Sequence, residues 1–385
     1  MRRIRLLDIL RGFAIIGTLG TNIWIFANAG KITSLFGDGI PWWDSWDTFL
    51  SAVIAVFING KLLGLLTIMF GVGLEIKYQK AQRNGNTWPG LYLWSMLLLF
   101  VDGLLHYFFV FEYDVLMSYA VTAVFVSFIV NHGTRWIKAA MWISGLIHLI
   151  LVSFLFLLFI NDRFSQGGFA HETTSVYLYG SYLEQIIFRM DHFWILRSEA
   201  IFILPMNVFL FLSGVLLMRS KVFSPSEHGK VIRRRLLKWG LFVGLPLNML
   251  YLVPNDMFNW PVRYLFAPVL SLAYVAIIGW FQENGKLTFV FAYLEKIGKM
   301  ALSCYMLQNI LASIVFYGWG LSFGNKLNSI EVIAVWIGIS LILAGFASLW
   351  FKRFQSGPVE FVWKRLSVFP MDKKAIQAPT KTEKF

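Results

Sequence analysis

The first apolar segment of the chain carries side chains that could do chemistry inside a membrane. In "LLDILRGFAIIGTLGTNIWIF", Asp8, Arg11 and Asn22 interrupt a run that is otherwise apolar enough to cross a bilayer. At about 100° per residue, Arg11, Thr18 and Asn22 fall within about 40° of each other, and Asp8 lies about 60° from Arg11. A stripe of this kind must face protein or water, because charge against lipid is costly. It predicts a binding site for a polar or anionic substrate. The residues equally allow an Asp8–Arg11 pair and an interhelical Asn22 hydrogen bond that are only structural.

A second apolar segment, "LYLWSMLLLFVDGLLHYFFVF", places Asp102 one turn before His106. An aspartate at that spacing can accept the ring N–H, select the tautomer and raise the basicity of the imidazole. In a dry site such a histidine is a general base for a hydroxyl or a thioester. We therefore predict His106 and Asp102 as candidate catalytic residues, with Asp114 in the following outer turn as a substrate ligand. The alternative is a buried Asp102–His106 pair whose side chains only hydrogen bond to each other and have no catalytic role.

Two further groups could hold parts of a substrate. "GKMALSCYMLQNI" places Tyr305 and Gln308 at about the middle of an apolar segment, where they could bind a substrate or hydrogen bond between helices. A basic stretch could bind the phosphates of a donor, although basic residues on the cytoplasmic side are also a general topology signal. Its candidate phosphate ligands are Arg233, Arg234 and Arg235.

The amino-acid composition indicates the class of fold that must position these side chains. Hydrophobic residues make up 57% of the 385 residues and charged residues 14%, whereas a soluble domain is about half apolar and a quarter charged. Tryptophans gather near the ends of the apolar runs, as at a membrane interface. The fold class is therefore an all-α, polytopic integral membrane helical bundle. The single Cys304 excludes an intrachain disulfide, and we expect no metal site.

Ten apolar runs are long enough to cross the hydrocarbon core, which takes about 20 residues. We expect them near 8–27, 61–76 with a lead-in at 49–59, 90–110, 114–131, 137–160, 199–218, 238–253, 263–281, 299–318 and 331–351.

The basic residues predict the orientation of these spans. With the N-terminus in the cytoplasm, the inner segments hold 26 lysines and arginines and the outer segments hold 7. The positive-inside rule then places both termini in the cytoplasm. The net charge of +13 is thereby explained by topology, so the lipid bilayer is the expected partner and nucleic acid is not. The first run, with "ANA" at 27–29, also resembles a cleavable signal peptide, but Asp8 and Arg11 favour its retention.

The loops divide the chain into parts. Residues 1–218 form an N-terminal transmembrane half with spans one to six and an outer loop at 161–198, in which an amphipathic interfacial helix is expected. Residues 219–237 are a basic cytoplasmic loop. Residues 238–370 form the C-terminal transmembrane half, and 371–385 are a cytoplasmic tail.

Five segments together resemble the YeiB-like bacterial membrane proteins, known as domain of unknown function 418. "RIRLLDILRGFAIIGTLGTNI" is similar to the opening pattern of that family, and "FINGKLLGLLTIMFGVGLEI" to its second segment. "GLLHYFFVFEYDVLMSYA" matches a third pattern, with Tyr113 where glycine is usual. "IGKMALSCYMLQNI" and "SGPVEFVWKRL" match the two C-terminal signatures, with Cys304 where asparagine is common. The resemblance covers nearly the whole chain.

This family in turn resembles integral-membrane acyltransferases, which share the Asp-x-x-Arg-Gly start found here as Asp8, Arg11 and Gly12. The resemblance implies a cytoplasmic acyl-CoA donor, no bound cofactor, and an acceptor outside. Acyltransferases of the cell envelope have a catalytic histidine at the position of Asn22. The lysosomal type has asparagine there and takes its histidine from the next outer segment, but residues 28–60 contain none. Either His106 replaces that histidine, or this branch of the family has a different activity.

The leading hypothesis is a multi-pass protein of the bacterial plasma membrane that moves a short acyl group from acyl-CoA to an envelope glycan or lipid-linked acceptor. A polar cavity between spans one, three and nine would hold the reaction. The alternative is a carrier or exporter of a small molecule without covalent chemistry, and a membrane protein of assembly or signalling is a third class.

Overall fold

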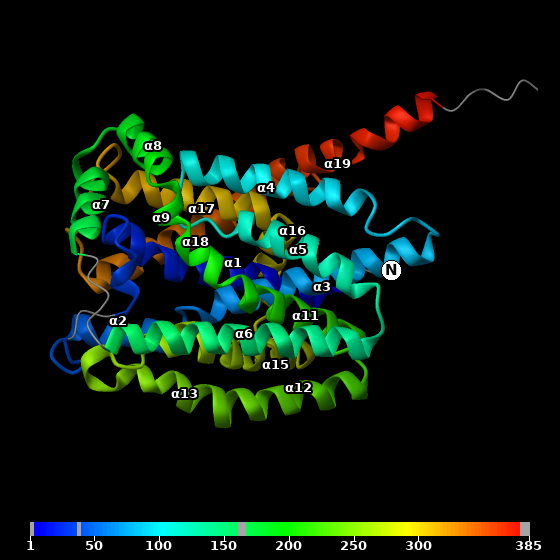
Figure 1. The fold of residues 1–385 in the computed structure, drawn as a ribbon, viewed down its shortest axis with the longest axis horizontal. Helices are drawn as coiled ribbons and strands as arrows, with labels where there is room; N and C mark the ends of the chain where they lie inside the picture. The colour runs from blue at the N-terminus through cyan, green and yellow to red at the C-terminus, as the bar shows by residue number, and fades with distance from the viewer. Residues whose placement is uncertain (1–3, 37–39, 161–166, 378–385) are drawn as a thin grey trace, which may run out of the picture.

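The computed structural model describes residues 4–36, 40–160 and 167–377, and in these ranges it contains helices and turns but no strand. Most of the long helices run along one common direction, so the molecule is an elongated bundle (Figure 1). We call the end at which α1 begins the N-terminal face and the opposite end the far face. The first helices are α1 (Arg5–Ala27), η1 (Ile32–Phe36), α2 (Trp46–Phe57), α3 (Lys61–Arg83), α4 (Leu91–Phe109), α5 (Leu116–Val130) and α6 (Thr134–Ile160).

The middle of the chain forms short helices at the far face and then returns through the bundle. Its elements are α7 (Gly167–Tyr179), α8 (Tyr182–Asp191), α9 (Phe193–Leu196), α10 (Ser198–Phe202), α11 (Leu204–Arg219), α12 (Glu227–Trp239), η2 (Gly240–Gly244) and α13 (Leu245–Met249). The last part contains η3 (Leu250–Leu252), η4 (Pro254–Asp256), α14 (Asn259–Pro261), η5 (Val262–Phe266), α15 (Ala267–Glu283), α16 (Thr288–Lys299), α17 (Ala301–Phe316), α18 (Ser329–Trp350) and α19 (Pro358–Gln377).

Several of these helices are suited to a membrane. In the described ranges, six are long and apolar enough to cross one, or seven if the bent pair α16–α17 counts as one span, and α5 and α11 are shorter apolar helices. The outer surfaces of α6 and α18 carry large apolar side chains, among them Leu146, Ile150 and Leu341, the last 67% exposed. Apolar surface of this extent marks contact with lipid or another apolar partner. The prediction of an all-helical bundle is confirmed, and the apolar helices support its membrane setting.

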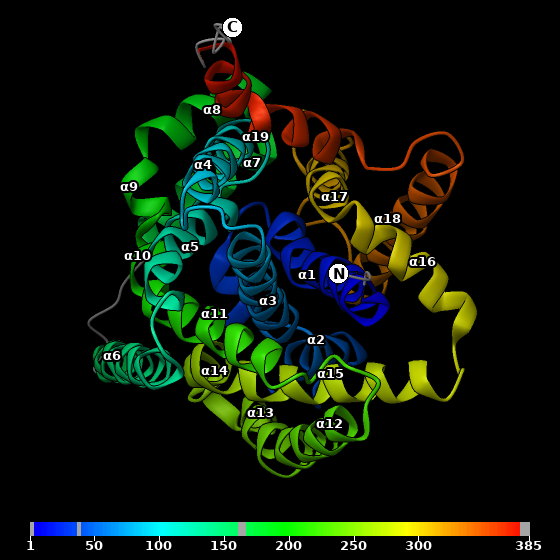
Figure 2. The same cartoon turned by 90° about the vertical axis from the view of Figure 1, so that its right-hand side faces the viewer.

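The centre of the bundle is built around α1 and α3, which the other helices surround (Figure 2). Two glycines allow α16 to cross the start of α1 at backbone contact. A Cβ at Gly12 would lie 1.9 Å from the Leu294 oxygen, and a Cβ at Gly298 would lie 1.8 Å from the Asp8 oxygen. The "LRG" of the first signature and the "IGK" of the fourth are therefore two sides of one helix crossing.

The chain bends by 93° between α16 and α17. This break leaves backbone N–H groups at the start of α17 without helical partners. Glu360, in the first turn of α19, accepts from the N–H groups of Leu302 at 2.8 Å and Ser303 at 3.2 Å, and from the Ser303 hydroxyl. The signature "SGPVEFVWKRL" thus caps the helix that the preceding signature forms.

Two predicted loops contain helices. The basic segment 219–237 is helical from Glu227 onward, because Ser226 caps α12 by accepting from the Gly229 N–H at 3.3 Å. In 161–198 the described residues contain the helices α7 and α8, and α8 begins at a capping box of Ser181 and Glu184. Residues 161–166 and the end of the predicted tail lie outside the described residues.

Candidate functional site

The polar faces of α1, α4 and α17 meet in the interior of the bundle. Asn22 Nδ2 donates to Asn309 Oδ1 over 3.5 Å, and Asn309 Nδ2 lies 3.0 Å from His106 Nε2. His106 and Asn309 are both buried. The structure therefore joins Asn22 to His106 through Asn309, the residue that follows Gln308 on α17.

This chain of hydrogen bonds selects the tautomer of His106. An amide nitrogen can only donate, so His106 Nε2 must accept, and the neutral ring carries its proton on Nδ1. The acceptor nitrogen is thus turned toward Asn309 and Asn22, while the ring lies beside Tyr305 with centroids 5.3 Å apart. The basic atom of the imidazole faces the meeting point of the three helices.

Asp102 does not orient this ring. In the described part of the chain Asp102 and His106 share no hydrogen bond, and the Asp102 carboxylate lies beside the Trp363 indole of α19 instead. The expected Asp102–His106 bond is therefore not formed. The four-residue spacing places both side chains on similar faces of α4, but α19 packs against α4 at Asp102, whereas α17 packs against it at His106.

The Asp114 carboxylate accepts three hydrogen bonds, two from the backbone of α5 and one from Tyr305. Its Oδ2 accepts from the N–H groups of Leu116 at 2.7 Å and Met117 at 3.3 Å, which caps α5. Its Oδ1 accepts from the Tyr305 hydroxyl at 3.1 Å. We call the buried group Asn22, His106, Asn309, Tyr305 and Asp114 the junction.

A cavity of about 340 Å³, the N-terminal cavity, leads toward the junction from the N-terminal face. Three cationic residues line it, Arg11, Lys77 and Lys299, together with one carboxylate, Glu360, and with Tyr305 of the junction. The Lys77 ammonium lies 5.2 Å from the centre of the Tyr92 ring and 5.1 Å from that of the Trp363 ring. The remaining walls are largely apolar, formed by side chains such as Ile15, Leu66, Met69, Phe70, Met96 and Leu99.

The other predicted residues of the first helix line this cavity or lie beside it. Arg11 Nη1 is 3.6 Å from Asp8 Oδ1, and Asp8 is buried while about a third of the Arg11 side chain is exposed. Lys299 of α16 forms an ion pair with Glu295 at 2.5 Å.

Gln308 of α17 is fully buried and lines neither this cavity nor the small one described next. Its two polar atoms have no hydrogen-bond partner among the described residues.

A second, small cavity of about 40 Å³ lies beyond the junction, toward the far face. Asn22 and Asp114 line it. Since Tyr305 lines the N-terminal cavity and donates to Asp114, one hydrogen bond connects the walls of the two cavities. At the far face itself, a groove of about 460 Å³ is lined by aromatic and polar side chains, among them Trp24, Trp42, Trp43, Asp47, Asn255 and Asp256.

The three arginines of α12 lie apart from the N-terminal cavity. Arg233 is buried, pairs with Glu283 of α15, and donates to the carbonyl oxygens of Val222 and Ser224. Arg234 and Arg235 are exposed on α12. The structure therefore does not bring these three residues together with Arg11, and the side chains beside Arg11 are Lys77 and Lys299 instead.

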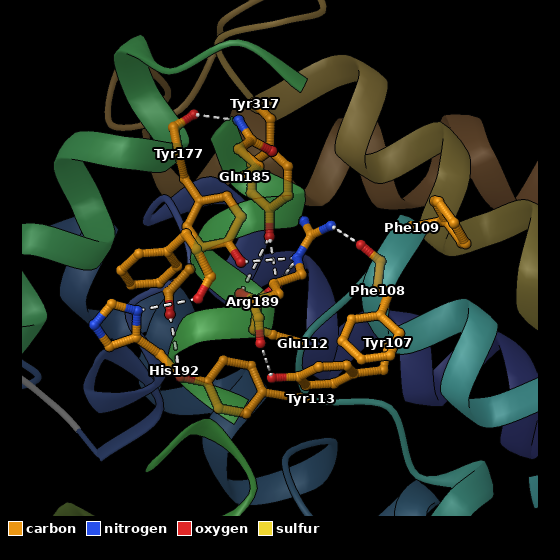
Figure 3. A network of polar contacts seen from close by, with 12 residues as sticks. Tyr107, Phe108, Phe109, Glu112, Tyr113, Tyr177, Gln185, Arg189, His192 and Tyr317 are labelled. Carbon is orange, nitrogen blue, oxygen red and sulfur yellow. Dashed lines mark hydrogen bonds and ion pairs between the residues drawn. The ribbon is translucent and has the colours of Figure 1, made fainter. Parts of the chain in front are cut away.

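A fully buried ion pair holds α8 against the end of α4 (Figure 3). Arg189 Nε is 3.5 Å from Glu112 Oε2 and donates to the Tyr177 hydroxyl at 2.9 Å, and Nη1 donates to the Phe108 oxygen at 2.9 Å. Burial raises the pKa of Glu112 above its usual value, and the Arg189 charge acts in the opposite direction. Sequence reasoning missed this pair, because nothing in the α8 pattern distinguishes Arg189 from an interfacial anchor.

Comparisons with known proteins agree with the resemblance of the sequence patterns. Residues 217–370 match the family model described as "Protein of unknown function (DUF418)". The chain is 26% identical to the uncharacterized protein YxaH of Bacillus subtilis (strain 168), over 97% of this chain and 96% of the relative. It is 25% identical to the uncharacterized protein YeiB of Escherichia coli (strain K12), over 96% and 97%. These matches support the YeiB-like family, and the names of these relatives state no activity.

Proposed function

We propose that the chain is a multi-pass protein of the bacterial plasma membrane, related to membrane acyltransferases, that transfers a short acyl group. The donor is an acyl-CoA that enters the N-terminal cavity from the cytoplasm. The acceptor is an envelope glycan or a lipid-linked molecule that approaches from the far face. In this proposal the N-terminal face is cytoplasmic and the chain crosses the membrane ten times.

One observation carries the proposal: a largely apolar cavity lined by three cationic residues and one carboxylate also reaches Tyr305, which donates a hydrogen bond to Asp114. Its volume of about 340 Å³ is in the usual range of small-molecule sites. Arg11, Lys77 and Lys299 would meet the phosphates of the donor, and the apolar walls would surround the pantetheine arm. The thioester would then lie next to the junction.

The junction supplies the groups for the transfer. When an acceptor hydroxyl replaces Asn309 as the donor to His106 Nε2, the imidazole takes its proton. The acceptor oxygen attacks the thioester carbon, the C–O bond forms and the C–S bond breaks. The CoA thiolate leaves and takes the proton from the His106 imidazolium, which restores the neutral ring. In this proposal Tyr305 and Asn22 exchange their present acceptors, Asp114 and Asn309, for the oxyanion that develops on the thioester. Asp8 and Asp114 stay in the proposal as groups that hold Arg11 and Tyr305 in place, whereas Gln308 lines neither cavity and has no part in it.

The carrier hypothesis also has an observation in its favour. The 93° break between α16 and α17 lies at the edge of the N-terminal cavity, and broken helices beside a central site are typical of transporters. A carrier needs both cavities but no base. The two hypotheses therefore differ in the result expected for His106.

Donor binding tests the proposal directly. Lys77→Gln keeps much of the side-chain length but removes the charge, and we expect acyl-CoA to bind about tenfold more weakly, because a hydrogen bond to a charged group contributes about 1.5–3 kcal/mol. The measurement is isothermal titration of the purified protein in detergent with acetyl-CoA.

The matched control is the double variant Arg234→Gln, Arg235→Gln, which neutralises exposed basic residues of α12 away from the cavity. We expect it to bind as the parent does. If this control loses binding and Lys77→Gln does not, the donor binds at α12 and the cavity assignment fails. A parent protein without any acyl-CoA binding would remove the basis of the acyltransferase proposal.

The orientation has its own test. Because 26 of the lysines and arginines lie on the predicted inner segments, a reporter fused after Phe385 is expected to read cytoplasmic. A reporter inserted in the turn between α7 and α8 is expected to read extracytoplasmic. A cytoplasmic signal from the second fusion would contradict the ten-span arrangement.

A further inference from the structure

The small cavity is lined by two arginines and two carboxylates. Arg197, Arg263, Asp114 and Glu199 line it. Arg263 Nη2 lies 3.7 Å from Glu199 Oε1, and Arg197 donates to the Asp114 backbone oxygen at 2.6 Å. Both carboxylates also accept from tyrosines, Asp114 from Tyr305 and Glu199 from a hydroxyl at 2.5 Å. The charges that line the cavity are thus balanced.

Two donors at this cavity have no partner. Thr21 Oγ1 and Arg263 Nε are buried and make no hydrogen bond among the described residues, and both residues line the cavity. Thr21 is only 2% exposed. Buried polar groups are normally satisfied, so two unpaired donors at one cavity indicate that something accepts from them.

A third cation lies behind Arg263. Lys61 is fully buried, and its ammonium donates to the Ala55 oxygen at 2.6 Å. Within the described ranges no carboxylate forms an ion pair with Lys61. The segment that carries it packs on Arg263, because Asn59 Oδ1 accepts from the Arg263 guanidinium and Gly60 contacts the Arg263 backbone. With Lys61 protonated, the cluster has one positive charge more than its carboxylates balance.

We propose that the small cavity binds a small monocarboxylate anion, of the size of acetate, between Thr21 and Arg263. The carboxylate oxygens accept from the two free donors, and the negative charge balances Lys61. This site does not rest on the proposed acyl transfer, since the same charge balance applies to a carrier.

The cavity favours this class of anion by size and by lining. Its volume of about 40 Å³ holds about three waters, since one water needs about 10–15 Å³ by this measure. That is enough for acetate and too little for a sugar acid. The lining also includes apolar side chains that a methyl group can contact and that chloride does not need, namely Ile25, Leu63, Leu196 and Ile203.

The test is the thermal unfolding midpoint of the full-length protein in detergent, at constant pH and ionic strength, as sodium acetate replaces sodium gluconate. A ligand that binds only the folded state raises the midpoint, and we expect a saturable rise of about 2 °C or more. Gluconate is too large for the cavity and serves as the inert anion. No rise, or an equal saturable rise with chloride, would overturn the monocarboxylate site.

Variants locate the effect. Thr21→Val keeps the shape and removes the free hydroxyl, so the acetate-dependent rise should fall to less than a third. Thr122→Val in α5, at a buried threonine that does not line the cavity, should keep the full rise. Lys61→Met removes the excess positive charge, so acetate should no longer be needed to balance it and should no longer raise the unfolding midpoint. An unchanged rise in folded Thr21→Val protein means that acetate acts elsewhere and the assignment is wrong.

Discussion

The variant His106→Gln is expected to lower acyl transfer by roughly 10²- to 10⁴-fold, the usual contribution of a general base, with little loss of folded protein. In the parent protein, His106 Nε2 accepts a hydrogen bond from Asn309 Nδ2 over 3.0 Å. The glutamine oxygen can accept from the same amide group, so this hydrogen bond is kept in the variant. An amide cannot take up a proton, so only the chemistry is removed. Acetyl transfer from acetyl-CoA by the purified protein, measured beside the yield of monodisperse protein, checks this result.

His148→Gln is the matched control, because His148 is also buried but bonds to the Tyr264 oxygen at 3.0 Å, away from the junction. It should transfer acyl groups as the parent does. Asp102→Asn should also have little effect, since Asp102 lies beside Trp363 rather than His106. Full transfer by His106→Gln would contradict the base assignment and favour the carrier. Loss of folded protein in both His106→Gln and His106→Ala would make the residue structural.

Breaking the buried pair of Glu112 and Arg189 is expected to destabilise the protein by about 3–5 kcal/mol, because one partner is then left as an uncompensated buried charge. Both side chains are almost fully buried, and Arg189 connects α8 to α4 and Tyr177 (Figure 3). We expect Arg189→Met to show the larger loss, since it strands a carboxylate and also removes the bonds to Phe108 and Tyr177. Denaturant unfolding in detergent measures the change.

The double variant Glu112→Gln, Arg189→Met should recover part of the loss, because no buried charge remains. Glu227→Gln at the exposed pair with Lys230 is the control, and we expect no measurable change there. Burial raises the pKa of Glu112. If the raised pKa lies above the pH of the measurement, the folded carboxyl is protonated, Glu112→Gln costs nothing, and stability falls as the pH rises through the raised pKa. That outcome would show that the contact is not an ion pair.

The helical content and the apolar character of the fold could be predicted from composition and run length, because each membrane helix satisfies its own backbone and needs no knowledge of its neighbours. The polar stripes on span one and span three could be predicted for the same reason, as helical periodicity fixes the angle between side chains on one helix.

The partners of these stripes could not be predicted in this way. His106 pairs with Asn309 rather than Asp102, and Glu360 caps α17 from 57 residues away in sequence. Lys77 and Lys299, rather than the arginines of α12, lie beside Arg11 at the cavity. Each of these facts depends on the rotation and depth of a second helix relative to the first.

The sequence by itself determined that the chain is a bundle of apolar helices and which face of α1 and of α4 is polar, since both follow from the order of residues within one helix. Only the tertiary structure decided that these faces meet at Asn309, that Asp114 connects two cavities through Tyr305, and that Arg189 is paired. The physical reason is that a buried polar group takes whichever partner packing brings within about 3 Å, and packing is set by contacts between segments far apart in the chain, such as the glycine crossing of α1 and α16.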